Sequence, residues 1–262
     1  MRRMRLGATM IALAFSSAAL GSPIIISSGD SLIVDSATNA MYDVRGSLDI
    51  RTGAEIASVS NYGADGPGAV TMSGGRVDQG ISVNGGVFDA SGGEVHGWWA
   101  GLDVGRAQAT ISGGTFVGGD SSTQAGSGVL GGAGNWDGVP FLSQLTISGG
   151  TFIGGTGSGG YYGGTTGYSL LSLGNTTVTG GQFLSPIAIN ATYGGVTSFL
   201  GTDLSYDVAT HTLSGVLQNG DAIHALLYLS AGAVAKTGDA GAGSPFSYAA
   251  DAPDPTTPPD ST

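Results

Sequence analysis

The sequence predicts an all-β fold of stacked turns, a β-solenoid. A seven-residue phrase, Thr-Ile-Ser-Gly-Gly-Thr-Phe, stands at residues 110–116 and returns at 146–152. Internal repetition of this kind is typical of solenoids. The composition agrees, because 50 of 262 residues are glycine and only 10% are charged. Looser copies, with an apolar residue, a small polar residue, two glycines, any residue and a second apolar residue, occur at 72–77, 90–95 and 178–183, and one with Asn for Ser at 83–88.

The spacing of the phrase indicates the length of one turn. The Ser or Thr before the paired glycines falls at residues 73, 91, 112, 148 and 179, so the steps are 18, 21, 36 and 31 residues. The two short steps match one turn, and the longer ones fit a turn with an inserted loop. Glycine-rich segments at 118–135 and 154–168 would supply those loops. We therefore expect about five to seven irregular turns.

Within the phrase, the two glycines must change which way the side chains face. Ile111 and Phe116 are five positions apart, so in an unbroken strand they would point to opposite faces of the sheet. A bend or bulge at the glycines would send both side chains into one core. Ser112 and Thr115 would then face outward.

Other segments complete the predicted domain. A final unit from about residue 203 is expected to cap the open end of the stack, with a strand at 212–217 and either a strand or a short helix at 222–231. Residues 236–262 form a predicted flexible tail rich in Pro, Asp and Thr. Further strands are expected at 24–26, 31–34, 47–50, 81–83, 102–104, 129–130 and 170–172.

The first 21 residues have the order of a signal peptide. Arg2, Arg3 and Arg5 form a charged start, and residues 10–20 form an apolar stretch too short to span a bilayer. Small residues then occupy the positions that a signal peptidase reads. The alternative is a short N-terminal helix. We expect export, with the mature chain in the periplasm, at the cell surface or outside the cell.

Charge and cysteine content exclude several classes of partner. The formal net charge is −11 at pH 7, and without residues 1–21 five basic side chains remain against 19 acidic ones. Such a surface repels nucleic acid and anionic membranes. Because the chain has no cysteine, it has neither a disulfide nor a thiolate metal site. No segment after the signal has the roughly 20 apolar residues of a membrane span.

The Gly-Gly phrases, the uneven glycine-rich loops and the closing segments 204–207 and 213–221 resemble exported bacterial right-handed parallel β-helix proteins. This group includes adhesin-like surface proteins and autotransporter passengers. The resemblance covers about residues 30–235. It implies a right-handed parallel β-helix over 22–235, and a non-enzymatic role as an adhesin-like or structural protein that presents its loops for contact. The segment 250–262 departs from the group because it contains no apolar sorting helix.

A polysaccharide lyase or glycoside hydrolase on the same scaffold is the alternative function. Asp89, Glu94, Asp103 and Arg106 form the best local set, because paired carboxylates act as acid and base or bind Ca²⁺. Charged residues at turns are usually exposed to solvent and have no catalytic role. The chain also has few basic groups that could neutralise an acidic polymer. A non-enzymatic function is therefore favoured.

No cofactor or metal is expected from the sequence. The segment 131–137 is similar to one calcium-binding nonapeptide repeat, but Trp136 replaces the ligand aspartate and no second copy follows. The three histidines, His96, His211 and His224, lack the spacing of a metal or nucleophile motif.

Five aromatic side chains are candidates for contact with a glycan or another surface partner. Sugar rings stack well on exposed aromatics, and loops on a rigid scaffold often carry binding sites. If Trp98 and Trp99 lay on a strand, one of them would face the core, since neighbours alternate. The oligomeric state stays open. The candidates are Trp98, Trp99, Trp136, Tyr161 and Tyr162.

The first testable prediction concerns export. Because of the charged, apolar and small-residue order of residues 1–21, we expect the mature protein to begin at Ser22 and to be recovered outside the inner membrane. N-terminal sequencing of protein purified from its host checks this. Recovery of Met1 or Arg2 at the start of most molecules would contradict it.

Overall fold

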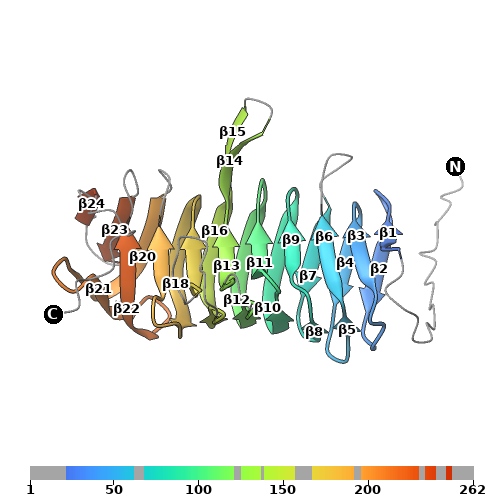
Figure 1. The fold of residues 1–262 in the computed structure, drawn as a ribbon, viewed down its shortest axis with the longest axis horizontal. Coiled ribbons are helices and arrows are strands. Elements are labelled where there is room, and N and C mark those ends of the chain that lie inside the picture. Colours follow the sequence, from blue (N-terminus) through green and yellow to red (C-terminus); the bar gives the residue numbers. More distant parts are fainter. Residues whose placement is uncertain are drawn as a thin grey trace, which may run out of the picture.

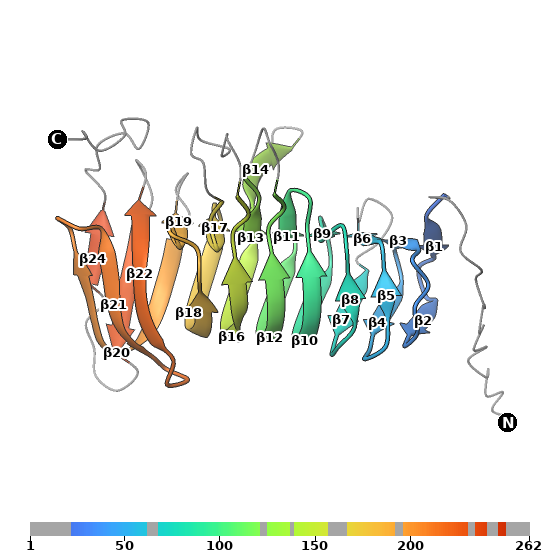
Figure 2. The ribbon, with the colours of Figure 1, turned by 60° about the horizontal axis from the view of Figure 1, so that its bottom comes forward.

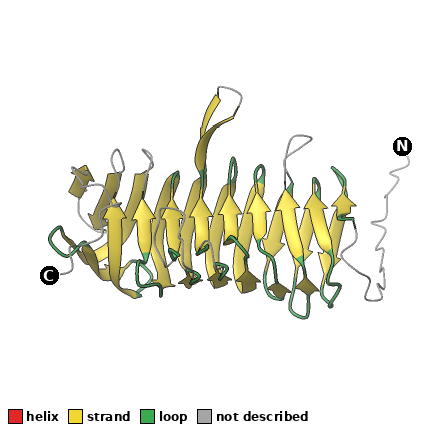
Figure 3. Ribbon diagram, in the orientation of Figure 1, coloured by secondary structure: helices red, strands yellow, loops and turns green. Residues whose placement is uncertain are grey.

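A computed structural model describes residues 22–61, 68–120, 125–136, 139–156, 167–191, 196–229, 234–239 and 246–249. These residues form a 22-stranded sheet, whose pairings are mostly parallel, and a separate two-stranded hairpin. None of the described residues is helical (Figure 3). The prediction of an all-β fold is therefore confirmed.

Consecutive strands alternate between two parallel ladders that run along the long axis of the molecule (Figure 1 and Figure 2). Ladder A contains β1 (Ile24–Ile26), β3 (Met41–Val44), β6 (Ser58–Asn61), β9 (Ile81–Val83), β11 (Ala100–Val104), β13 (Ser127–Gly131), β17 (Leu170–Ser172), β19 (Ile189–Ala191) and β22 (Ala222–Leu229). Ladder B contains β2 (Ser31–Val34), β4 (Ser47–Ile50), β7 (Ala69–Met72), β10 (Val87–His96), β12 (Gln108–Val117), β16 (Gln144–Ile153), β18 (Asn175–Phe183), β20 (Val196–Asp207) and β23 (Val234–Asp239). Two short strands also belong to ladder B: β5 (Glu55–Ile56) pairs with β8 (Arg76–Val77), and β8 pairs with the second half of β10.

The core consists of columns of equivalent apolar side chains. Ile111 is paired with Ile147, and both are fully buried. Phe116, Phe152 and Phe183 follow one another in the same way, with ring centroids 5.7 Å and 5.2 Å apart in stacked geometry. Each fully buried side chain of this size contributes about 1.5–3 kcal/mol to folding. Stacking therefore supplies the burial that one turn alone does not provide.

The glycine pairs change the facing of the strand as expected. The second glycine of each pair has a positive φ, for example 96° at Gly114 and 101° at Gly150. Register shifts occur at this break between β10 and β12 and between β16 and β18. As a result Ile111 and Phe116 both enter the core, while Ser112 is exposed. The predicted facing is confirmed.

The serine and the first glycine of the phrase contact the turn before them. The hydroxyls of Ser112 and Thr179 donate hydrogen bonds to the carbonyl oxygens of Ala90 and Ile147, at 3.1 Å and 3.2 Å. A Cβ added to the first glycine would meet the serine carbonyl of the preceding turn, at 2.7 Å in the case of Gly92. The phrase thus needs a hydroxyl and an absent side chain at adjacent positions.

The copy at 83–88 occupies a different corner from the others. Gly86 has a φ of 76°, but it lies between β9 and β10, where the chain passes from ladder A to ladder B. The other five phrases lie within ladder B. A similar sequence therefore forms the break within ladder B in five copies and the connection from ladder A to ladder B in the sixth.

One element was not expected from the sequence. Strands β14 (Ala133–Trp136) and β15 (Val139–Leu142) form an antiparallel hairpin that projects from the body of the molecule (Figure 1). The sequence carries a signal for it, because Asp-Gly at 137–138 is a favoured hairpin dipeptide.

The C-terminal end changes from parallel to antiparallel pairing. Strand β20 pairs with β21 (Thr212–Leu217), and β21 pairs with β22, so residues 222–229 are a strand rather than a short helix. Strand β23 adds to the edge of β20, and β24 (Phe246–Ala249) pairs with β23. Paired strands thus continue past residue 236, where the sequence predicts a tail, because the backbone edge of β20 accepts another strand.

The core columns make a direct prediction. Ile111→Asp should lower the free energy of unfolding by about 3–5 kcal/mol, because it places an unpaired charge in the apolar core. Ser112→Asp, one residue later on the exposed side, should cost about 1 kcal/mol through loss of one hydrogen bond. Denaturant melts of both variants check this, and equal destabilisation by the two changes would contradict the assigned facing.

Candidate functional site

The outer face of ladder A changes character along the molecule. Its strands place equivalent outward side chains in one row, in which polar and apolar stretches follow one another. In chain order the row consists of Ile25, Asp43, Ser60, Ser82, Asp103, Leu130, Leu171, Asn190 and Tyr228. The carboxyl and hydroxyl groups from β3 to β11 give way to leucines on β13 and β17, so this polar stretch ends at β11.

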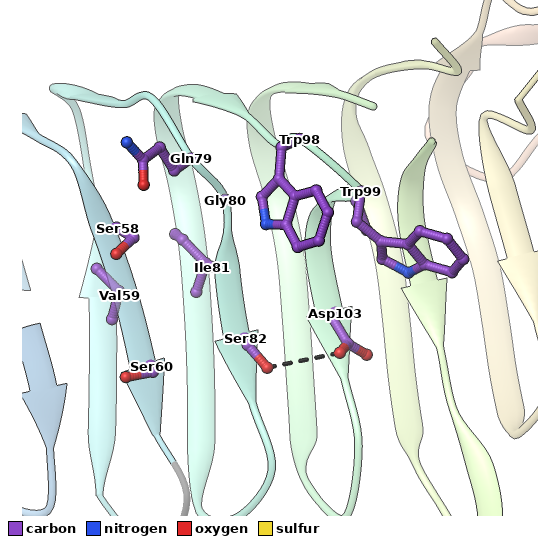
Figure 4. A pocket seen from close by; sticks show the side chains of 11 residues that line it. Ser58, Val59, Ser60, Gln79, Gly80, Ile81, Ser82, Trp98, Trp99 and Asp103 are labelled. Atoms are coloured by element: carbon purple, nitrogen blue, oxygen red, sulfur yellow. Dashed lines mark hydrogen bonds between the residues drawn. The ribbon is translucent and has the colours of Figure 1, made fainter. Parts of the chain in front are cut away.

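A groove of about 270 Å³ lies over β6, β9 and β11 in this polar stretch. Figure 4 shows both indoles above Asp103, with Trp98 on the side of Ile81 and Trp99 on the opposite side. The volume is near the lower end for small-molecule sites. The polar and aromatic side chains that line the groove are Ser58, Ser60, Gln79, Ser82, Trp98, Trp99 and Asp103.

Both tryptophans lie in the turn between β10 and β11, outside any strand. The alternation that would have sent one indole into the core therefore does not apply. Trp98 is 76% exposed, and Trp99 is partly exposed. A large apolar side chain exposed to this degree at the edge of a groove is available to a ligand.

Asp103 stands at the floor of the groove. Burial raises the pKa of Asp103 to about 6, and the hydrogen bond from the Ser82 hydroxyl, at 3.5 Å, acts against this rise. The ordinary pKa of an aspartate is about 3.9. The carboxyl group therefore changes its charge near neutral pH rather than in acid.

The other candidate catalytic residues lie elsewhere. Asp89 and Glu94 are on β10 in ladder B, where Glu94 contacts His96 at 2.5 Å and Arg76 at 4.0 Å. Arg106 lies in the turn between β11 and β12. The four predicted groups are thus distributed over two ladders and a turn, and only Asp103 lines the groove.

The other aromatic candidates and the histidines are placed as follows. Trp136 is in β14 of the projecting hairpin. Tyr161 and Tyr162 lie outside the described residues. His211 stacks on Tyr228 at a centroid distance of 5.4 Å, and His224 contacts the Ser214 hydroxyl at 2.9 Å. Among the described residues, no three His, Asp or Glu side chains gather closely enough to hold a metal ion.

Four polar lining residues were not predicted from the sequence: Ser58, Ser60, Gln79 and Ser82. The signal for the three serines is the period-two pattern of β6 and β9, in which polar residues alternate with buried ones, whereas Gln79 precedes β9. The pattern becomes informative only once the register between these strands is known.

Comparison of the chain with protein-family models, with curated proteins and with solved structures finds no match. In the part of the chain that the structure describes, no helix is long and apolar enough to cross a membrane. We therefore infer function from the groove itself.

The pKa of Asp103 predicts a dependence of stability on pH. The folded state keeps the proton up to about pH 6, whereas the unfolded chain loses it near 3.9, so the free energy of unfolding falls as the pH rises through this window. Asp103→Asn should raise the free energy of unfolding at pH 7 by about 2 kcal/mol and leave it unchanged below pH 4.

Thermal melts of wild type and variant at pH 3.5, 5 and 7 would measure this effect, at values chosen roughly around the window. Asp89→Asn, the same change at an exposed position of β10, serves as the control. A variant that is no more stable than wild type at pH 7 would show that the charged form of Asp103 is not penalised.

Proposed function

We propose that this chain is an exported, non-enzymatic surface or extracellular protein of the adhesin-like type, which binds a glycan in the groove beneath Trp98. The observation that carries the proposal is an indole 76% exposed at the edge of a groove whose floor is a row of hydroxyl groups. The order of residues 1–21 supports export.

The scaffold in this proposal is a right-handed parallel β-helix over residues 22–235. Strands alternate between the two ladders, and most are paired in parallel with the strand of the next turn, as Leu32 is with Leu48 and Phe88 with Ala109. These partners are 16 and 21 residues apart. Crossover connections between parallel strands are right-handed in nearly all proteins, which favours the same hand here.

Glycan binding fits the chemistry of the groove. A sugar ring has an apolar face that stacks on an indole and an edge of hydroxyl groups that exchange hydrogen bonds with serine and amide side chains. Trp98 offers the first kind of contact, and Ser58, Ser60 and Gln79 offer the second. Because these groups come from three adjacent turns, a short chain of sugars would lie across the strands.

Glycan cleavage is the second candidate, favoured by the raised pKa of Asp103, since a pKa near 6 suits a general acid. Glycoside hydrolases pair such an acid with a second carboxylate, about 5–9.5 Å away. Among the described residues that line the groove, Asp103 is the one carboxylate. Binding without turnover therefore agrees better with the groups present.

The binding proposal predicts the effect of losing the indole. Trp98→Ala should weaken binding of a glycan identified on an array by about tenfold, because stacking of a ring is worth about 1 kcal/mol beyond its burial. Trp98→Phe should retain most of the affinity. Leu184→Ala removes a side chain 58% exposed several strands away and should change nothing.

Affinity measured by calorimetry and thermal melts of each variant separate binding from folding. If wild-type protein releases unsaturated uronides or reducing ends, and Asp103→Ala or Arg106→Ala stops this, cleavage is the function. If no glycan binds the wild type, the groove is not a glycan site and a structural role takes the place of the proposal.

A further inference from the structure

We propose that the glycan carries a free amino group, with its ammonium beside the Asp103 carboxylate and its ring against Trp98. This inference rests on the proposed function and names its ligand class. It comes from the charge of the groove, the surroundings of Asp103 and the pattern of arginines along the chain.

The groove has one charge. Among its described lining residues, Asp103 is the only ionisable acid and none is cationic. A uronic acid would bring its carboxylate toward another carboxylate without a cation between them, which is unfavourable. An ammonium group instead gains a partner there, and an indole face attracts the same cation.

Asp103 differs from two other outward acids of the ladders, Asp43 and Asp49. Asp43 pairs with Arg45 at 3.2 Å, and Asp49 pairs with Arg51 at 2.6 Å. In both cases the arginine is two residues after the aspartate, on the same side of the strand. In these two strands an Asp-x-Arg pattern thus supplies the guanidinium group that pairs with the carboxylate.

At Asp103 the arginine comes one residue later, because Gly105 stands between Val104 and Arg106. A Cβ on Gly105 would meet the Oδ1 atom of Asn84, so a larger residue at that position would have to displace the Asn84 side chain. The hydrogen-bond partner that the structure gives Asp103 is the uncharged Ser82. A carboxylate accepts several hydrogen bonds, so acceptor positions remain for a ligand.

Within the described part of the chain, the groups that face Asp103 from the neighbouring elements are uncharged. Strand β9 contributes Ser82, strand β13 contributes Leu130, and the turn before β11 contributes Trp98 and Trp99. Burial raises the pKa of Asp103 to about 6, and none of these described neighbours carries a charge that would offset the cost. A bound ammonium would supply the missing charge and lower the pKa of Asp103.

The pH dependence of binding follows from this exchange. An ammonium favours the ionised carboxylate, so binding below about pH 6 must first release the proton from Asp103. Affinity should therefore rise by up to about tenfold per pH unit as the pH approaches 6 from below, and fall again where the amino group of the sugar loses its own proton. A neutral sugar would show no such rise.

Calorimetry with three oligosaccharides of equal length tests the inference: a glucosamine oligomer, its N-acetylated form and a galacturonate oligomer. At pH 7 we expect the glucosamine oligomer to bind about tenfold more tightly than the N-acetylated one. Asp103→Asn should remove this preference, so that the two oligomers bind with equal affinity. Trp98→Ala should weaken both.

The outcomes distinguish the two proposals. If the N-acetylated oligomer binds as tightly as the amine, or Asp103→Asn keeps the preference, the inference about the amine is wrong while glycan binding stands. If none of the oligomers and no array glycan binds, the proposed function itself fails. If Asp89→Asn, at an exposed site on ladder B, reduces the preference as much as Asp103→Asn, general attraction of a cation to the acidic surface explains the result and the inference is overturned.

Discussion

The structure depends on the conformation of the second glycine in each Gly-Gly pair. At Gly93, Gly114, Gly150 and Gly181 the φ angle lies between 93° and 110°, a region that other residues enter only at a cost. The turn at this glycine lets apolar residues five positions apart enter one core. The first glycine leaves room for the serine carbonyl of the turn before it. Two glycines are needed because the second adopts the positive φ without strain, whereas the first avoids a clash between a Cβ atom and the carbonyl oxygen of the preceding turn.

The same constraint explains why the surface is polar but weakly charged. Once the apolar positions are assigned to the core, the outward positions of the phrase fall to Ser, Thr and a variable residue, as at Ser112 and Thr115. Hydroxyls such as that of Ser112 also hold the preceding turn by a hydrogen bond. Solvation therefore comes from short polar groups. Each of the few charged side chains then needs either water or a partner of opposite charge to offset the cost of its burial. Pairing with a nearby arginine is how Asp43 and Asp49 accommodate theirs.

Residues 72–183 could be predicted well from the sequence because the phrase marks each turn there. Its spacing identified the strands and the facing of Ile111 and Phe116. The first turns carry no Gly-Gly pair, so the register of β6, and with it Ser58 and Ser60, had no sequence marker. Local alternation also did not reveal that Trp98 leaves the strand, because a turn of a few residues suspends the period of two. The hairpin of β14 and β15 was hidden by a glycine-rich composition typical of loops.

The location of the groove follows from how the outward side chains change along ladder A. Where the outward row becomes Leu130 and Leu171, the side chains are apolar, and Leu171 is itself buried. Toward the N-terminus, Asp43 is already neutralised by Arg45. Asp103 lies between these two regions, next to the exposed indole and without an adjacent arginine. A ligand that brings both an apolar ring face and a positive charge is the one that satisfies both groups at once, and this is the physical reason for locating recognition at this turn.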